Sequence, residues 1–151
     1  MNRQDLKDQV WLEVAFAVSK LGTCGRRQVG AVFLDEKGRV LATGYNGVAP
    51  GDPHCIDLPC PGWNCASGTG LELCEAIHAE QNGIVQLREL DRVHTVYCTD
   101  SPCIHCVKMI AATSAKRIVF ARPYPHSTSE AYWKGRGGVW SHVPYQPLPR
   151  P

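Results

Sequence analysis

Two short segments with metal-ligating side chains place the strongest constraint on how this chain can fold. The first is His78-Ala79-Glu80, and the second is Pro102-Cys103-Ile104-His105-Cys106. Each lies at the start of a predicted helix. Residues three apart share a helix face, so the sulfurs of Cys103 and Cys106 point the same way. The positive end of the helix also favours the thiolate forms that bind metals.

Together the two segments predict a catalytic zinc site. Two thiolates and the His78 imidazole leave one open position on a four-coordinate zinc, and a water bound there has a pKa lowered to about 7. Glu80 would act as a proton shuttle that takes the water's proton and returns it to the substrate. A lone C-x-x-C also fits a redox pair or half of a zinc ribbon, and His105 could be proposed as a ligand. Because His105 lies between the two cysteines in sequence, its side chain points away from their sulfurs, and we favour His78 as the ligand.

Composition indicates an ordinary soluble protein of one domain. The 151 residues carry 16 Lys and Arg against 14 Asp and Glu, a formal net charge of +2 that does not predict nucleic-acid binding. No apolar stretch is long enough to span a membrane, and residues 1–5 lack the apolar region of a signal peptide. We therefore expect a cytoplasmic protein. Among its eight cysteines, those that cluster near histidine are expected to bind metal instead of forming disulfides.

The hydrophobic pattern predicts helices and strands that alternate along the chain. This order is typical of an α/β domain in which helices cover both faces of a mixed sheet. We expect one domain over residues 1–143 and an extended proline-rich tail over 144–151. The expected helices are Gln4–Leu21, Glu72–Leu90, Pro102–Thr113 and Ser127–Lys134, and the expected strands are Gln28–Leu34, Arg39–Tyr45, Val93–Thr99, Arg117–Ala121 and Val139–Val143.

From Leu12 to about Tyr124 the sequence resembles the deoxycytidylate (dCMP) deaminase family, phage and bacterial type. The resemblance rests on Val29-Gly30-Ala31-Val32, Thr43-Gly44-Tyr45-Asn46-Gly47, Pro53-His54-Cys55-Ile56-Asp57 and the two metal segments. The H-x-E and P-C-x-x-C pattern is shared by zinc deaminases of nucleobases. The resemblance implies a cytidine-deaminase-like fold, a three-layer α/β/α arrangement with a sheet of about five strands.

The resemblance also implies the reaction and its residues. The reaction would be hydrolysis of dCMP to dUMP and ammonia, with zinc held by His78, Cys103 and Cys106 and with Glu80 as the shuttle. Substrate contacts are expected from Asn46, Thr99, Ser101 and Tyr124. By sequence alone Asn46 would equally be a turn residue and Tyr124 a core aromatic. An arginine among Arg26, Arg27 and Arg122 could meet the phosphate.

The resemblance also implies a second, structural zinc, which some relatives carry, and regulation by nucleotides. Cys24 and Cys55 match two of its ligands, and Cys60, Cys65 and Cys74 are available to complete it; we expect Cys60 and Cys74. The alternative is a set of unpaired structural thiols. The family is typically hexameric, activated by dCTP and inhibited by dTTP, often with Mg²⁺ on the triphosphate. Part of that effector site is expected at Gly44, Tyr45, Asn46 and Gly47.

Two other functions compete with this prediction. One is deamination of another base, such as guanine or the adenosine of a tRNA, although the modest net charge argues against tRNA. The other is a non-catalytic, zinc-stapled binding module for nucleotides or DNA. Glu80 argues against this module, because a purely structural site has no use for a carboxylate beside its metal.

Overall fold

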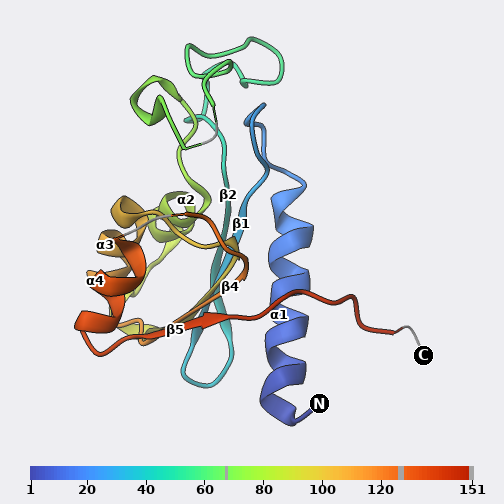
Figure 1. The fold of residues 1–151 in the computed structure, drawn as a ribbon, viewed down its shortest axis with the longest axis vertical. Coiled ribbons are helices and arrows are strands. Elements are labelled where there is room, and N and C mark those ends of the chain that lie inside the picture. Colours follow the sequence, from blue (N-terminus) through green and yellow to red (C-terminus); the bar gives the residue numbers. More distant parts are fainter. Residues whose placement is uncertain (67, 126–127, 150–151) are drawn as a thin grey trace.

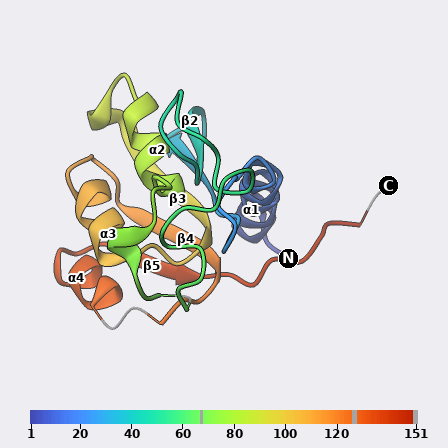
Figure 2. The same ribbon diagram turned by 90° about the horizontal axis from the view of Figure 1, so that it is seen from above.

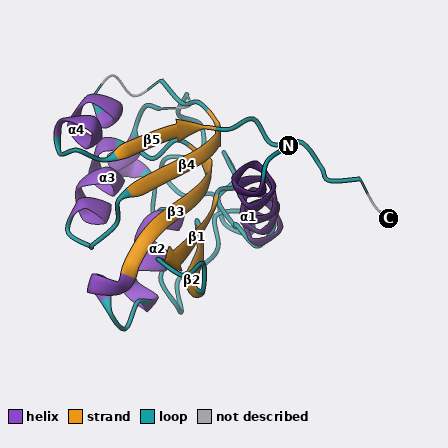
Figure 3. Cartoon of the chain, turned by 90° about the horizontal axis from the view of Figure 1, so that it is seen from below, coloured by secondary structure: helices purple, strands orange, loops and turns teal. Residues whose placement is uncertain are grey.

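The computed structural model describes residues 1–66, 68–125 and 128–149, and its centre is a five-stranded sheet (Figure 1). The strand order is β2-β1-β3-β4-β5. The strands are β1 (Gly30–Asp35), β2 (Val40–Tyr45), β3 (Val93–Asp100), β4 (Arg117–Arg122) and β5 (Val139–His142). β1 is antiparallel to both β2 and β3, whereas β3, β4 and β5 run parallel (Figure 3). The predicted mixed sheet is therefore confirmed.

Helices cover both faces of the sheet and form the predicted three layers (Figures 2 and 3). On one face lies α1 (Arg3–Ser19), which packs Leu12 and Ala15 against Val32 of β1 and its neighbours. The other face carries α2 (Ala79–Gln86), α3 (Ile104–Ala111) and α4 (Ser129–Gly135). None of the described helices is long and apolar enough to cross a membrane.

A buried ion pair attaches α1 to the sheet. Both oxygens of Asp8 accept hydrogen bonds from Arg117 of β4, at 2.8 and 2.7 Å, and the Tyr97 hydroxyl donates to the same carboxylate at 2.7 Å. Burial opposes the charged form, yet these hydrogen bonds lower the pKa of Asp8 below its usual value. Asp8 is therefore ionised at neutral pH and fixes the helix across two strands.

The segment after β5 packs on the same helix (Figure 1). Gln9 donates to the carbonyl oxygen of Pro144 at 3.0 Å and accepts from the amide of Gln146 at 2.9 Å. Tyr145 stacks on Phe16 with ring centroids 4.8 Å apart. Residues 144–149 form neither helix nor strand, and Arg150 and Pro151 of the expected tail lie outside the described residues. The domain boundary at residue 143 stays a prediction.

The expected helix over Glu72–Leu90 was wrong over much of its length. Only α2 is α-helical there, with short 3₁₀ turns at Leu71–Leu73 and Leu90–Arg92. Ile77 pairs with Gly47 through two backbone hydrogen bonds of 2.8 and 3.1 Å, which holds this part of the chain extended until His78 caps α2. This pairing joins distant segments, so local periodicity could not reveal it.

Two helix starts also differ from the prediction. Pro102 precedes the N-cap residue Cys103 and so lies outside α3, whose first residue is Ile104. The last helix begins at Ser129, while Ser127 of the expected helix lies outside the described residues. Neither difference affects the metal-ligating segment, because Cys103 and Cys106 still lie at the start of α3.

Candidate active site

The two metal-ligating segments meet at the N-termini of neighbouring helices. His78 is the N-cap of α2 and Cys103 is the N-cap of α3, with Cys106 in its first turn. The backbone amide of His78 donates to Gln81 at 3.1 Å, which fixes the entry to α2. Helices α2 and α3 pack side by side (Figure 2). This arrangement brings the imidazole close to both sulfurs.

The three side chains have the geometry of a metal site. Nδ1 of His78 lies 3.2 Å from Sγ of Cys106 and 3.6 Å from Sγ of Cys103. All three candidate ligand atoms lie within 4.8 Å of one another, the one such group found among the described residues. Tetrahedral zinc bonds imply ligand separations of about 3.5 to 3.8 Å, so the arrangement fits zinc. His105 is exposed and outside this group.

Charge in this cluster is set by short contacts and burial. The hydrogen bond from Cys106 lowers the pKa of Cys103 to about 3, and His78 adds to the effect. The same bond raises the pKa of Cys106, and the contact with Cys103 raises the pKa of His78. A metal cation bound here would take the place of the protons on these groups, because thiolates and neutral imidazole are the forms that bind metal.

Glu80 lies next to the ligands and is almost fully buried. Its side chain is 4% exposed and interacts with the Cys106 thiol and the His78 ring. Burial raises the pKa of the Glu80 carboxyl group above its usual value. A carboxyl group of this kind holds a proton more readily than an exposed one, which suits it to proton transfer.

A cavity opens onto these residues. It lies where β1 begins and where β3 and β4 end, and the loop before α2 forms one wall. Of the predicted substrate residues, Asn46, Ser101 and Tyr124 line it together with His78 and Glu80.

Two predicted substrate residues have structural partners. Thr99 is fully buried below the cavity; it donates to Asp100 at 2.7 Å and accepts from the Gly30 amide at 3.2 Å. The Asn46 amide group donates to the carbonyl of Arg27 at 2.6 Å and accepts from the amide of Val29 at 2.8 Å. Asn46 thus fixes the segment that carries Arg27, and its contact with substrate stays a prediction.

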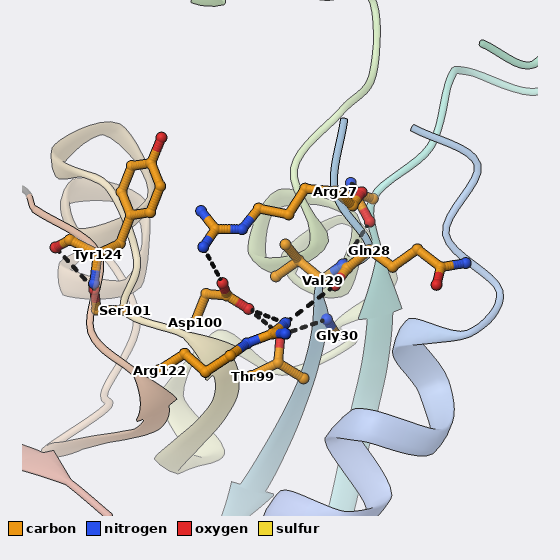
Figure 4. A network of polar contacts seen from close by, with 10 residues as sticks. Arg27, Gln28, Val29, Gly30, Thr99, Asp100, Ser101, Arg122 and Tyr124 are labelled. Atoms are coloured by element: carbon orange, nitrogen blue, oxygen red, sulfur yellow. Dashed lines mark hydrogen bonds and ion pairs between the residues drawn. The ribbon is translucent and has the colours of Figure 1, made fainter. Parts of the chain in front are cut away.

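Ser101 and Tyr124 join the ends of β3 and β4. The Ser101 hydroxyl accepts from the backbone amide of Tyr124 at 2.7 Å and donates to its carbonyl oxygen at 3.2 Å (Figure 4). This pair of bonds places the Tyr124 ring at the cavity wall. The sequence predicted both residues at the site, and the structure brings them together there.

Sequence reasoning missed Asp100, which joins two arginines at the cavity. Its side chain is buried and contacts Arg27 and Arg122, at 2.6 and 2.7 Å (Figure 4). The available signal was an acidic residue at the end of a buried strand, directly before Ser101-Pro102-Cys103. Such a residue needs a cationic partner when buried.

Four of the remaining cysteines surround the loop before α2. The sulfurs of Cys55 and Cys60 lie 3.2 Å apart, and Cys60 also interacts with Cys74. Cys74 in turn interacts with Cys24. Pairwise contacts thus link the four cysteines expected for a second zinc, but among the described residues they do not form a compact metal-sized group, and the second zinc stays a prediction. Arg26 donates to carbonyl oxygens within residues 65–69 and braces the same loop.

The residues expected to form part of an effector site, 44–47, differ in burial and in their contacts. Gly44 is buried where β2 passes below α2, and a Cβ atom there would lie 2.1 Å from the carbonyl oxygen of Ala79. Tyr45 is exposed, and Gly47 forms the backbone bridge to Ile77. The structure thus gives Gly44 a packing role, and the effector role of the run stays a prediction.

An α/β/α sandwich with an imidazole, two sulfurs and a buried carboxyl group at two helix N-termini defines the class of zinc-dependent deaminases. Comparison with known proteins agrees. Residues 5–122 match the family described as the cytidine and deoxycytidylate deaminase zinc-binding region. The chain belongs to this family, and the resemblance seen in its sequence is confirmed.

Individual relatives point to deoxycytidylate deaminases within the family. The chain is 35% identical to the deoxycytidylate deaminase of Schizosaccharomyces pombe over 87% of its own length, but it spans only 42% of that protein. It is 35% identical to the deoxycytidylate deaminase of Mycobacterium phage D29, covering 81% of this chain and 98% of the phage protein. The crystal structure of dCMP deaminase from cyanophage S-TIM5 with dCMP and dUMP superimposes with a TM-score of 0.75 at 26% identity, covering 95% and 99% of the two chains.

Proposed function

We propose that this protein hydrolyses dCMP to dUMP and ammonia. The observation that carries the proposal is Glu80, a buried carboxyl group beside a His-Cys-Cys cluster at a cavity. Family membership supports the reaction type. The similarity to deoxycytidylate deaminases, one of them crystallised with dCMP and dUMP, supports the substrate.

In the proposed mechanism His78, Cys103 and Cys106 hold zinc. When bound, zinc lowers the pKa of a coordinated water and so supplies the nucleophile. Glu80 accepts a proton from the attacking water and delivers it to N3 of the cytosine ring. The water oxygen bonds to C4, Glu80 transfers the second proton to the exocyclic nitrogen, and the bond from C4 to that nitrogen breaks. Ammonia and dUMP account for all atoms.

Two further parts of the proposal concern metal and regulation. Cys24, Cys55, Cys60 and Cys74 would hold a second, structural zinc, supported by their mutual proximity. A closed site of this kind would staple a loop that has little core of its own. Activation by dCTP, inhibition by dTTP, Mg²⁺ on the triphosphate and a hexameric assembly are proposed from the family resemblance.

Glu80→Gln tests the catalytic assignment. The variant keeps the size of the side chain but loses the transferable proton, so we expect normal zinc content and a fall in kcat of about 10² to 10⁴. Ammonia release is measured from dCMP, dCTP, deoxycytidine and cytidine, each with and without dCTP or dTTP. Full activity of Glu80→Gln would refute the mechanism. Wild-type turnover of dCTP, deoxycytidine or cytidine without turnover of dCMP would refute the substrate.

A further inference from the structure

Three arginines lie around the cavity, and their partners distinguish them. Arg26 also lines the cavity, but its Nη1 donates to the carbonyl oxygens of Cys65 and Thr69 and its guanidinium interacts with the Cys74 thiol. Arg122 donates to Asp100 at 2.7 Å and is not among the residues that line the cavity. Arg27 does line the cavity, and its guanidinium lies over the Tyr124 ring, 4.2 Å from the centroid (Figure 4).

The contact between Arg27 and Asp100 leaves most of the guanidinium available. Nη2 of Arg27 lies 2.6 Å from Oδ2 of Asp100, yet this oxygen has no aligned hydrogen bond within the described residues. No other oxygen in the described part of the chain accepts from this guanidinium. A guanidinium has five N–H donors. The side chain is 34% exposed and lines the cavity, which leaves donors for a ligand.

The charges favour an anion at this position. Two guanidinium groups share the single carboxylate of Asp100, which leaves an excess of one positive charge. Arg122 and Thr99 both donate to Oδ1 of Asp100, and only Oδ2 is left to Arg27. Arg27 is therefore the cavity-lining cation of this pair, with donors left for a second anion. The planar fork of arginine matches the oxygens of a phosphate group.

We infer that Arg27 binds the 5′-phosphate of the nucleotide and is the residue that distinguishes a nucleotide from a nucleoside. The inference rests on the proposed function, since Arg27 and Glu80 line the same cavity and would contact opposite ends of one substrate. Tyr124, Asp100 and the Asn46 contact with the Arg27 backbone hold the side chain across the cavity. This ordering before binding reduces the entropy lost when the phosphate arrives.

The test compares Arg27→Gln with Arg122→Gln in the zinc-loaded protein. Both variants remove one positive charge beside Asp100, but only Arg27 lines the cavity. For Arg27→Gln we expect kcat/KM for dCMP to fall roughly 10- to 100-fold, with the value for deoxycytidine unchanged. Arg122→Gln should lower the values for both substrates by a similar factor, because Arg122 contacts Asp100 but does not line the cavity. Arg27→Lys keeps the charge without the fork and should fall between wild type and Arg27→Gln.

An equal loss with dCMP and deoxycytidine would show a packing role for Arg27, and an unchanged value with dCMP would place the phosphate elsewhere; either overturns the inference. If turnover of deoxycytidine is too slow to measure, calorimetric titration with dUMP and deoxyuridine gives the same comparison. A wild-type protein that deaminates neither substrate refutes the proposed function. The dUMP titration then still decides the role of Arg27, because it needs no turnover.

Discussion

Gly44→Ala is expected to damage the active site although Gly44 does not line the cavity. A Cβ atom at this position would lie 2.1 Å from the carbonyl oxygen of Ala79 and 2.5 Å from the amide nitrogen of Gly83, both on α2. Ordinary contacts begin at about 3.4 Å, so the backbone of α2 must move by more than 1 Å. Ala79 lies directly between His78 and Glu80. The shift therefore moves a proposed metal ligand and the proposed proton shuttle together.

A misplacement of about 1 Å is enough to reduce kcat/KM about 10²-fold. Overpacking of this kind also costs about 1 to 3 kcal/mol of stability, a fall in Tm of roughly 2 to 12 °C for a domain of this length. Ammonia release from dCMP and thermal unfolding measure the two effects. Gly47→Ala is the matched control, since its Cβ atom would lie 3.2 Å from the Thr23 hydroxyl, a side-chain atom, and farther from everything else.

Near-normal activity and Tm in Gly44→Ala would show that the packing argument is wrong. A loss of activity seen only when dCTP or dTTP is present would instead assign Gly44 to an effector site. We expect the loss with and without these nucleotides, and a much smaller one in Gly47→Ala.

Two further predictions concern stability and metal content. Asp8→Asn should lower the free energy of unfolding at pH 7 by about 2 kcal/mol or more, because Arg117 loses its charged partner. Since folding lowers the pKa of Asp8, its stabilising contribution is present above pH about 4 and is lost as the pH falls further. The Tm values of variant and wild type should therefore converge in acid, and a constant difference would contradict this. Cys60→Ser should remove the second zinc and keep the first, while the control Cys65→Ser keeps both, as measured by metal analysis of the purified proteins; an unchanged zinc content in Cys60→Ser would leave these cysteines as plain thiols.

The chemistry of the site could be predicted because it depends on short spacings. The ligands and the carboxyl group lie within three residues of one another in each segment, and helix geometry then decides which of them share a face. The mixed sheet and its three layers followed from the resemblance and from alternating apolar segments. Predictions of this kind stay correct when the predicted end of a helix is wrong by a residue or two. Helix α3 begins two residues later than expected, yet Cys103 and Cys106 still lie together with His78.

What could not be predicted depends on contacts between distant segments. The ion pair between Arg27 and Asp100 joins the segment before β1 to the last residue of β3, and no local pattern marks either residue as a partner. The bridge from Gly47 to Ile77 shortened α2 in the same way. Asn46 was chosen for its capacity to donate and accept, and it does both, but with the backbone at Arg27 and Val29.

The proposed ligands of the first zinc come from two helices that cover different parts of the sheet. α2 packs on β1 and β2, whereas α3 lies between α2 and α4. An ion held between them ties the two parts together, so its binding energy adds to the stability of the whole fold. A chain without the ion opens more often and is then cut by proteases. We therefore expect the cellular abundance of this protein, and not only its specific activity, to follow the supply of zinc.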